Sequence, residues 1–434
     1  MRMCLTSDLG GYYTTKQEGR DQFGQKGDFI TSPEISQIFG ELIGVWFVAE
    51  WMAQGRKSKG VELVEIGPGR GTLMDDMLRT IRNFSMASSI EAVYMVEASP
   101  ALRETQQKLL CGDAPMTETD IGYQSTSKYA NIPIIWTENI RYVPSDVNKT
   151  PFIVAHEFFD ALPIHAFQSV APSESFQNTI QTPTGEHVLT PEAAKSRQAK
   201  EPQWRELVVS PAPPDEIHTT TSAQSSDPPP EFQLTLAKAS TPHSLYLPEI
   251  SERYRALKAT PGSLIEISPE SHAYVQDFAR RIGGTTAEPK PRPSGAAIIL
   301  DYGPADTIPI NSLRGIREHK RVSPLSSPGL VDLSADVDFV ALAEAAIGAS
   351  PGVEVHGPVE QGMFLLSMGI KERAEMLMKG LGSDEDKRQR VESSWKRLVD
   401  RHKNGMGRIY KAMAIVPESG GSRRPVGFGG DVPA

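Results

Sequence analysis

The sequence predicts an α/β protein whose core is a Rossmann-like, mostly parallel sheet with helices on both faces. Two observations favour this class. Short apolar, β-rich runs alternate along the chain with longer segments of helical pattern, which is typical of layered domains with right-handed crossovers. The strand candidates are apolar almost throughout, not only at every second position, and this indicates strands that are buried on both faces.

The expected strands and helices follow one another in a simple order. The strand candidates are Val61–Gly67, Glu91–Ala98, Ile132–Trp136, Phe152–His156 and Ala296–Tyr302, with Val353–Val355 and Ile409–Val416 as candidates to close the set. Helices are expected at Leu73–Phe84 and Pro100–Leu110. For the second helix, Ser99 is a suitable N-cap and Pro100 suits the first helical position.

One elaborated domain is expected for the 434 residues. Residues 1–60 are expected to form an N-terminal helical lid, residues 61–416 the main domain and residues 417–434 a loose tail. From about 170 to 248 the chain is rich in Pro, Ser, Thr and Gln, and such stretches bury too little apolar surface to offset the entropy of ordering. We therefore expect a mobile, low-complexity insertion, interrupted by a hairpin of Trp204–Val209 and Glu231–Leu236.

The composition argues against several other classes of protein. A formal net charge of -9, from 45 basic and 54 acidic residues, gives no general attraction to nucleic acid or to an anionic membrane. No apolar run is long enough to predict a transmembrane helix. Cys4 and Cys111 form no metal-spaced cluster, so the sequence predicts no metal site and a reducing compartment. Residues 1–19 have neither a signal-peptide core nor the pattern of a presequence.

The strongest motif is a strand, a glycine-rich loop and a helix. It reads Val64-Glu65-Ile66-Gly67-Pro68-Gly69-Arg70-Gly71-Thr72-Leu73. Glycine lets the backbone turn sharply and lets a ligand approach without meeting a Cβ atom. The helix amino terminus then offers free N–H groups and a positive dipole end. The loop therefore supplies candidate cofactor-binding residues: Glu65, Gly67, Gly69, Gly71 and Thr72.

Two classes of ligand use such a loop. Dinucleotide sites prefer G-x-G-x-x-G, with the pyrophosphate at the helix terminus. Here Thr72 stands at the position of the third glycine, and Gly71 comes one residue early. Glu65 would repel a pyrophosphate, but it suits a ligand with a cationic amino-acid head, such as S-adenosylmethionine. A tight turn that binds no ligand is the plain structural alternative.

A second acid follows one strand later. Glu97 ends the next expected strand, at the same edge of the sheet, where a carboxylate can accept hydrogen bonds from ribose hydroxyls. The third strand ends at Trp136-Thr137-Glu138-Asn139, and either Asn139 or Glu138 is a candidate for contact with an adenine amino group. Ordinary solvation of a loop is an equal alternative for these two residues.

A second group of candidates follows the fourth strand in His156-Glu157-Phe158-Phe159-Asp160. Open α/β sheets bind ligands beyond the carboxyl ends of their strands, so His156, Glu157 and Asp160 are the predicted catalytic residues. If the substrate were a cationic guanidinium group, carboxylates such as Glu157 and Asp160 would be suited to hold it through paired hydrogen bonds. The structural alternative is that Glu157 and Asp160 cap a helix and that His156 is a packed strand-end histidine.

A third cluster precedes an amphipathic helix expected at Ile35–Trp51. Ser32 is a suitable N-cap and Pro33 suits the first helical position. The functional interpretation is a lid over the cofactor, with Thr31 and Glu34 near it and Gly27 as a hinge. A simple helix start is the alternative.

Several long blocks resemble the MidA-like S-adenosylmethionine-dependent methyltransferases, from about Gly11 to Val416 and with the insertions between them. The blocks are GDFITSPEISQIFGELIG, VELVEIGPGRGTLMDDML, AHEFFDALPIHAF, WRELVV, DYGPADT, LRGIREHK, SSPGLVDLSADVDF and MGRIYKAMAI. The resemblance implies a class I methyltransferase fold and S-adenosyl-L-methionine as cofactor. It also implies symmetric dimethylation of an arginine on a core subunit of respiratory complex I during assembly, in the mitochondrial matrix.

The resemblance also carries residue roles. By motif, Gly67, Gly69 and Gly71 are implied to form the cofactor loop, Glu97 to bind the ribose, and Glu157 with its neighbours to form the catalytic edge. The family commonly has Tyr-Gly-His after the fifth strand. Here the segment reads Tyr302-Gly303-Pro304, so no histidine role is expected there, and the matching blocks that hold His319 and Asp332 suggest no chemistry for them.

Two other functions remain open from the sequence. A non-catalytic assembly chaperone could retain the same fold as a docking platform, although the intact glycine loop and Glu97 favour retained cofactor binding. A Rossmann oxidoreductase is disfavoured by the missing third glycine and by Glu65. The sequence predicts no oligomeric state.

Overall fold

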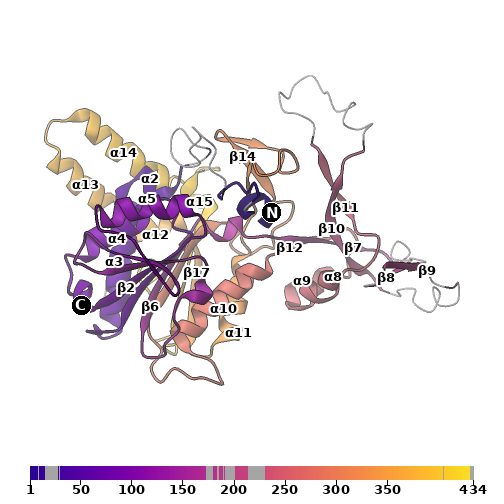
Figure 1. The fold of residues 1–434 in the computed structure, drawn as a ribbon, viewed down its shortest axis with the longest axis horizontal. Helices are drawn as coiled ribbons and strands as arrows, with labels where there is room; N and C mark the ends of the chain where they lie inside the picture. Colours follow the sequence, from indigo (N-terminus) through magenta and orange to yellow (C-terminus); the bar gives the residue numbers. More distant parts are fainter. Residues whose placement is uncertain are drawn as a thin grey trace.

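The protein is represented by a computed structural model that describes residues 1–7, 9–14, 28, 30–172, 179–182, 185–188, 190, 201–213, 230–403 and 405–430. A layered body holds the large sheet, and an arm built on β10 and β11 extends to one side (Figure 1). Gly27, expected to act as a hinge, lies outside the described residues. Within the expected low-complexity insertion, most of Thr182–Gln203 and of Pro211–Pro230 lies outside them as well.

The body is built on a nine-stranded sheet in the order β17-β18-β13-β6-β1-β2-β5-β4-β3. Its parallel centre comprises β1 (Val61–Ile66), β2 (Ile90–Val96), β5 (Pro133–Thr137), β6 (Thr150–His156) and β13 (Ala296–Tyr302). The antiparallel edges are β3 (Thr117–Thr119), β4 (Gly122–Thr126), β17 (Val353–Glu360) and β18 (Tyr410–Pro417). The predicted fold class and strands are confirmed, but β3 and β4 were missed because they are short and polar.

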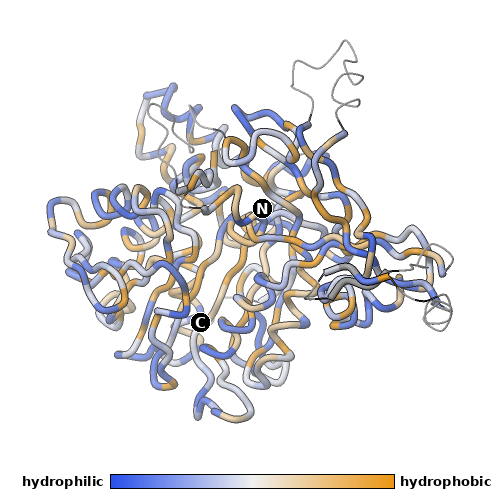
Figure 2. The backbone as a smooth tube through the Cα atoms, turned by 45° about the vertical axis from the view of Figure 1, so that its right-hand side comes forward, coloured by the Kyte–Doolittle hydropathy of each residue, from blue (hydrophilic) through white to orange (hydrophobic). Residues whose placement is uncertain are grey.

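The central strands are buried on both faces, as their apolar sequences predict. Leu63 and Phe152 belong to one core cluster, whereas Val64 and Ile153 belong to the other, because successive side chains of a strand point to opposite faces. The strands form a hydrophobic centre inside a more polar exterior (Figure 2). Every residue of β1 is buried, Glu65 included.

Helices cover both faces of the sheet. The first cluster is completed by α3 (Gln37–Ala53), α4 (Thr72–Ile81), α5 (Pro100–Cys111), α12 (Gln361–Ser367), α13 (Ile370–Gly380) and α14 (Glu385–Val399). The second is completed by α10 (Pro269–Gly283) and α11 (Phe339–Ala349). The short α15 (Met406–Ile409) leads into β18. The predicted helices after the glycine loop and after Ser99 are confirmed, and Ser99 accepts the N–H of Leu102 as an N-cap.

The expected helix Ile35–Trp51 is interrupted near its start. α2 (Ser32–Ile35) ends at Ser36, whose extended backbone begins α3 and whose hydroxyl accepts the N–H of Ile38. The prediction that Ser32 is the N-cap was wrong by one residue. Thr31 occupies that position, because its side chain and that of Glu34 form a reciprocal capping box, the arrangement that satisfies free N–H groups at a helix start.

A small sheet and the N-terminal helix cover one end of the body. The sheet comprises β14 (Arg314–Arg317), β15 (Lys320–Val322) and β16 (Asp332–Ser334), in the order β15-β14-β16. α1 (Arg2–Thr6) packs on it through Leu5, which shares a core cluster with Tyr12, Val331 and Leu333.

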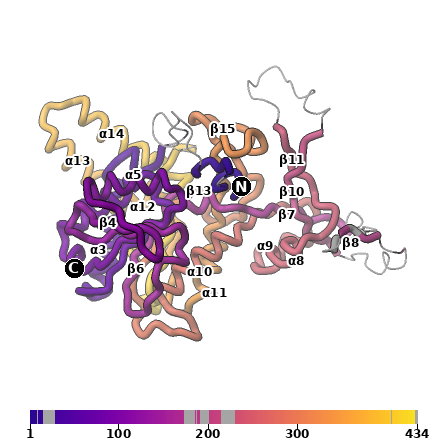
Figure 3. Tube along the Cα trace, viewed as in Figure 1, coloured from indigo at the N-terminus to yellow at the C-terminus, as the bar shows by residue number. Residues whose placement is uncertain are grey.

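The arm is a four-stranded sheet in the order β11-β10-β7-β12. Its strands are β7 (His165–Val170), β10 (Gln203–Pro211), β11 (Phe232–Leu236) and β12 (Leu264–Ile267), and β8 (Thr179–Thr182) pairs with β9 (Gly185–Val188). The helices α8 (Pro242–Tyr246) and α9 (Glu252–Leu257) lie beside it (Figure 3). The predicted hairpin is confirmed by β10 and β11, and Phe167, Trp204 and Tyr254 give the arm its own core.

Residues after Pro417 differ from the loose tail that was expected. Trp46 Nε1 donates to the carbonyl of Val426 at 3.0 Å, and Phe428 is buried in the main core. Arg423 donates from both terminal nitrogens to the carboxylate of Glu50, at 2.8 and 2.7 Å. The expectation was wrong for this segment because a buried acid on α3 and two aromatic rings hold it against the body. No helix of the described residues is long and apolar enough to cross a membrane.

We expect Arg423→Met to destabilise the protein, because it leaves the carboxylate of Glu50, which is 1% exposed, without its cation. The cost should be about 2 kcal/mol of unfolding free energy, below the value for a fully buried pair because Arg423 itself is partly exposed. Urea denaturation of the full chain measures it. The matched control is Arg424→Met, at an exposed neighbouring arginine; equal stability of the two variants would show that the pair does not fasten this segment.

Candidate active site

A cavity of about 510 Å³ lies beyond the carboxyl ends of β1, β2, β6 and β13. Twelve residues that the sequence predicted for the site or the lid line it, drawn from the N-terminal segment, the glycine loop and the ends of three strands. They are Thr31, Glu34, Glu65, Gly67, Gly69, Thr72, Glu97, Glu138, Asn139, His156, Glu157 and Asp160. Gly71 lies outside the lining as the N-cap of α4. The structure therefore brings the two predicted groups together in one cavity.

The glycine loop has the geometry that its sequence requires. Gly67, Gly69 and Gly71 have φ values of 63°, 52° and 83°, in the left-handed region that L side chains rarely adopt. A Cβ atom on Gly67 would also lie 2.7 Å from Cδ2 of Phe158. A side chain at Gly67 would therefore strain the turn and collide with the segment that follows β6.

Glu65 places a carboxylate in the cavity wall next to this loop. Burial raises the pKa of Glu65 well above its ordinary value, and the neighbouring Glu97 raises it further. Among the described residues, Oε2 of Glu65 is a buried oxygen with no hydrogen-bond partner. A buried acceptor of this kind is costly unless a donor satisfies it, so the site favours a ligand that brings a cationic donor.

Glu97 is held by a network centred on a residue that the sequence did not reveal. Gln106, which is fully buried, donates from Nε2 to the carbonyl of Gly69 at 2.6 Å and to Oε2 of Glu97 at 3.2 Å. Its Oε1 accepts the indole N–H of Trp136 at 2.9 Å. The other oxygen of Glu97 accepts the N–H of Ser99 at 2.8 Å. Burial raises the pKa of Glu97 to about 7 despite these donors.

Glu138 and Asn139 occupy the adjoining part of the cavity wall. Oδ1 of Asn139 accepts the N–H of Arg141 at 3.0 Å and so caps the short helix η2 (Ile140–Tyr142). Glu138 lies 3.3 Å from Nη1 of Arg103, and its side chain is 66% exposed. Contact of either residue with an adenine stays a prediction.

Asp301 fixes the backbone that carries the predicted catalytic residues. Its Oδ2 accepts the N–H groups of Phe158, Phe159 and Asp160 at 3.1, 2.8 and 3.4 Å. This carboxylate, at the end of β13, holds the segment after β6 in a tight turn. Glu157 begins the turn with a φ of 49°, a value uncommon for a residue with a side chain, and its N–H donates to the carbonyl of Leu300 at 3.0 Å.

The carboxyl group of Glu157 is directed into a buried, polar corner of the cavity. Oε1 accepts the N–H of Ser32 at 3.4 Å. The hydroxyl of Tyr410 contacts both this carboxyl group and the hydroxyl of Tyr302. Burial, together with the charges of Asp160 and Asp301, raises the pKa of Glu157 well above its ordinary value.

His156 contributes a neutral ring beside Glu157. Burial lowers the pKa of His156 to about 3, so the imidazole carries no charge at neutral pH. Its Nε2 lies 3.2 Å from Oε1 of Glu157, but the direction does not suit a hydrogen bond. We therefore regard this contact as packing next to the acid and not as an ion pair.

Asp160 lies on the short helix η3 (Phe159–Ala161) and faces a cationic neighbour. Burial raises the pKa of Asp160 to about 6, and the charge of Arg314 opposes this rise. Arg314 pairs with Asp336 and lies with its guanidinium carbon 5.2 Å from the centre of the Tyr302 ring. Neither Glu157 nor Asp160 is the N-cap of this helix, because Phe158 holds that position and the first N–H groups of the helix donate to Asp301.

The N-terminal segment contributes one wall of the cavity. Arg2, Leu5 and Thr6 of α1 line it, and Tyr13 donates its hydroxyl hydrogen to Oδ1 of Asp332 at 2.8 Å. Glu34 lies 3.5 Å from Nη1 of Arg70 in the glycine loop. Of the two residues to which the sequence gave no chemistry, Asp332 lines the cavity, whereas His319 is exposed in the turn between β14 and β15.

Asp332 should make the stability of the protein depend on pH. Burial raises the pKa of Asp332 from an ordinary 3.8 to about 7. The stability that protonated Asp332 contributes to the folded protein is therefore complete below pH 3.8 and is lost as the pH rises through 7. Between pH 6 and pH 8 the loss amounts to about 1 kcal/mol. Asp332→Asn keeps an acceptor for Tyr13 and should reduce the fall in stability between pH 6 and pH 8 by this amount, leaving the part that comes from Glu97 and Asp160.

The measurement is the unfolding free energy at pH 6 and pH 8 for the parent and the variant. The matched control is Asp306→Asn, at an exposed loop residue, which should keep the slope of the parent. An identical slope in the parent and in Asp332→Asn would show that Asp332 is ionised in the folded protein at both pH values.

Comparison with known proteins identifies the family. A family model described as "Putative S-adenosyl-L-methionine-dependent methyltransferase" matches residues 42–359. The protein named "Protein arginine methyltransferase NDUFAF7, mitochondrial" from Rattus norvegicus is 35% identical over 425 residues, covering 96% of this chain and 80% of its own. The human protein of that name is 34% identical, with coverage of 96% and 79%.

A solved structure extends this similarity to the fold. A Burkholderia thailandensis protein bound to S-adenosyl-homocysteine matches with a TM-score of 0.63 at 20% identity, covering 99% of this chain and 87% of its own. The fold, the family model and the relatives agree, and the chain belongs to this family of S-adenosyl-L-methionine-dependent methyltransferases.

Proposed function

We propose that the protein transfers methyl groups from S-adenosyl-L-methionine to an arginine side chain of a protein. The observation that carries the proposal is the set of buried acids, Glu157 and Asp160 foremost, in the same cavity as the glycine loop. The relatives are named mitochondrial protein arginine methyltransferases. We further propose a mitochondrial location and symmetric dimethylation of an arginine on a core subunit of respiratory complex I, as the family resemblance implies.

The residues around the glycine loop fit the cofactor. Glu65, with its unpartnered buried oxygen, is suited to the cationic amino-acid head. Gly67, Gly69 and the start of α4 at Thr72 leave the backbone open to close approach. Glu97 is proposed to accept the ribose hydroxyls, and Asn139 to contact the adenine. When bound, the cofactor supplies an electrophilic methyl group carried on a sulfonium ion.

The charge of the cavity favours a guanidinium as substrate. Its lining contains eight carboxylic acids and three arginines. Two of these arginines pair with Glu270 and Glu34, which also line it, and the third pairs with Asp336. The acids next to Glu157 are therefore in excess over cations. A guanidinium stays protonated at all ordinary pH values, so it can stabilise the ionised form of an acid whose pKa burial has raised.

Glu157 is the proposed catalytic residue and Asp160 a second holder of the guanidinium. A carboxylate that accepts two N–H groups fixes the plane of the guanidinium and orients the attacking nitrogen. Methylation would remove a proton from the attacking nitrogen, and the carboxylate of Glu157, with its raised pKa, would be a competent acceptor for that proton. Asp301 and His156 are proposed as positioning residues, because they fix the turn and pack beside Glu157.

The first prediction from this assignment concerns the ribose. Glu97→Ala should weaken the binding of S-adenosyl-L-methionine at least tenfold, because hydrogen bonds to a charged acceptor contribute about 1.5–3 kcal/mol each and each 1.4 kcal/mol is about tenfold in affinity. Isothermal titration at pH 8, where Glu97 is largely ionised, measures the dissociation constant. Glu118→Ala, at an exposed acid on β3, is the control. An unchanged constant in Glu97→Ala would remove Glu97 from the site.

The second prediction concerns catalysis. Glu157→Gln should retain cofactor affinity within a few-fold, because the carboxyl group is assigned to the substrate. Transfer should fall by about two orders of magnitude, the scale of losing a key charge-stabilising group. Radiolabelled methyl transfer to a purified complex I core subunit, run beside the binding titration, measures both quantities, with Glu118→Gln as the control.

The outcomes separate the alternatives. Normal transfer by Glu157→Gln would move the catalytic role to Asp160 or Glu34. Loss of cofactor binding as well as transfer would make Glu157 a structural residue or a cofactor ligand. A parent protein that binds the cofactor but transfers no methyl group to any complex I subunit would favour the non-catalytic assembly chaperone.

A further inference from the structure

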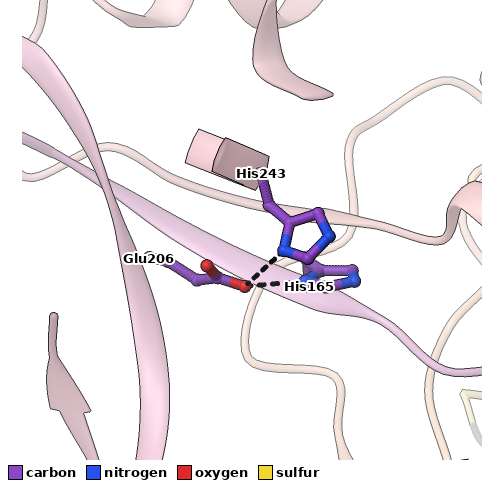
Figure 4. Close-up of side chains that lie close together, drawn as sticks. All are labelled: His165, Glu206 and His243. Atoms are coloured by element: carbon purple, nitrogen blue, oxygen red, sulfur yellow. Dashed lines mark hydrogen bonds and ion pairs between the residues drawn. The ribbon is translucent and has the colours of Figure 1, made fainter. Parts of the chain in front are cut away.

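Two histidines and a glutamate meet in the arm, away from the cavity. Nδ1 of His165 lies 2.7 Å from Oε1 of Glu206, and Nδ1 of His243 lies 3.9 Å from the same oxygen. Both rings turn a nitrogen toward this oxygen (Figure 4). Potential ligand atoms of the three side chains all lie within 4.8 Å of one another, and none of the three residues lines the cavity.

The three side chains come from separate elements that the fold holds in place. His165 begins β7, Glu206 lies on the neighbouring strand β10, and these strands are paired in antiparallel register. His243 lies in the first turn of α8, which a capping box of Thr241 and Ser244 fixes at its start. Strand pairing and the capped helix start therefore set the backbone positions of the three residues.

A hydrogen bond to Glu206 orients its carboxylate. The hydroxyl of Thr241 donates to Oε2, at 2.5 Å, which leaves Oε1 facing the two imidazoles. Secondary hydrogen bonds of this kind orient the ligands of metal sites. The side chain of Glu206 is 11% exposed, that of His165 26% and that of His243 55%, so the cluster is buried on one side and open to solvent on the other.

A simple hydrogen bond explains only part of this geometry. One imidazole N–H donating to Glu206 accounts for the distance to His165, but the second imidazole lies beyond hydrogen-bond distance of the same oxygen, with the ring centres 4.2 Å apart. Two imidazoles and a carboxylate can bind zinc-class ions, which in open sites take three protein ligands and a water. Ligand atoms in such a site lie about 3.3 Å apart, which lies between the two observed distances.

We propose that His165, Glu206 and His243 bind a divalent transition-metal ion of the zinc class, with the exposed side left to water. Such an ion would fasten α8 to β7 and β10 and so tie together segments that are far apart in the chain. The site is separate from methyl transfer and differs from the sequence-based expectation of no metal. Imidazole and carboxylate donors suit Zn²⁺ better than Mg²⁺ or Ca²⁺, which prefer oxygen ligands.

The test is isothermal titration of the full chain with ZnCl₂ after treatment with a chelator and desalting. The parent should bind one equivalent of Zn²⁺. His165→Ala and His243→Ala should each lower the affinity for Zn²⁺ at least about tenfold, because even the loss of a residue that only orients a metal ligand costs about 10–100-fold. His402→Ala is the matched control. His402 lies 3.7 Å from a carboxylate, with a side chain that is 95% exposed, and it should leave the affinity unchanged.

A second readout distinguishes a folded site from a damaged protein. Zn²⁺ should raise the melting temperature of the parent and of His402→Ala, as a ligand that binds the native state does, and a chelator should reverse this effect. His243→Ala, a change at a largely exposed side chain, should melt like the metal-free parent with or without Zn²⁺ and should bind S-adenosyl-L-methionine normally. No stoichiometric Zn²⁺ in the parent, or equal affinity in the parent and in the two histidine variants, would overturn the proposal.

Discussion

The carboxylate of Asp301 is the constraint on which the site depends. It lies at the end of a central strand and accepts three consecutive backbone N–H groups of the segment after β6. An unpaired backbone donor in a buried place is costly, so this one side chain satisfies the turn and fixes its shape. The direction of Glu157, its left-handed backbone and the packing of Phe158 against Gly67 all follow from that turn. The segment after β6 and the glycine loop are thus joined through a single acid that does not itself line the cavity.

The site collects acids in a place where water is scarce. Glu65, Glu97, Glu157, Asp160 and Asp332 are all buried or line the cavity, and burial raises the pKa of each. Isolated charges are expensive in a low-dielectric interior, so burial favours the neutral form of each of these acids. Both the cofactor and the proposed substrate carry a positive charge. A positive charge close to such an acid would lower its pKa, so binding of a cation and ionisation of the acid would be coupled.

Local patterns predicted much of the fold and part of the site. The apolar strands, the glycine loop and the N-cap at Ser99 follow from neighbouring residues, and the carboxyl ends of parallel strands necessarily share an edge, so Glu65, Glu97 and Glu157 fell in one cavity. Long-range contacts escaped prediction. In the sequence, Gln106 is only one of several polar residues of a helix. Its role depends on hydrogen bonds with Gly69 and Trp136, which the sequence does not reveal. Tyr13 and Asp332 are 319 residues apart, Arg423 pairs with Glu50 across nearly the whole chain, and His165, Glu206 and His243 have no metal-motif spacing.

The strand order has a consequence for the protein while it is still being synthesised. β6 pairs on one side with β1, but its other partner, β13, comes only after the arm has been made. At about 5–20 residues per second, the ribosome needs roughly 7–30 s to cover the distance from His156 to Tyr302. During that interval the apolar edge of β6 has no native neighbour, and unpaired strand edges promote aggregation. The insertion of an arm in mid-sheet therefore leaves this strand edge of the nascent chain without its native partner until β13 has been made.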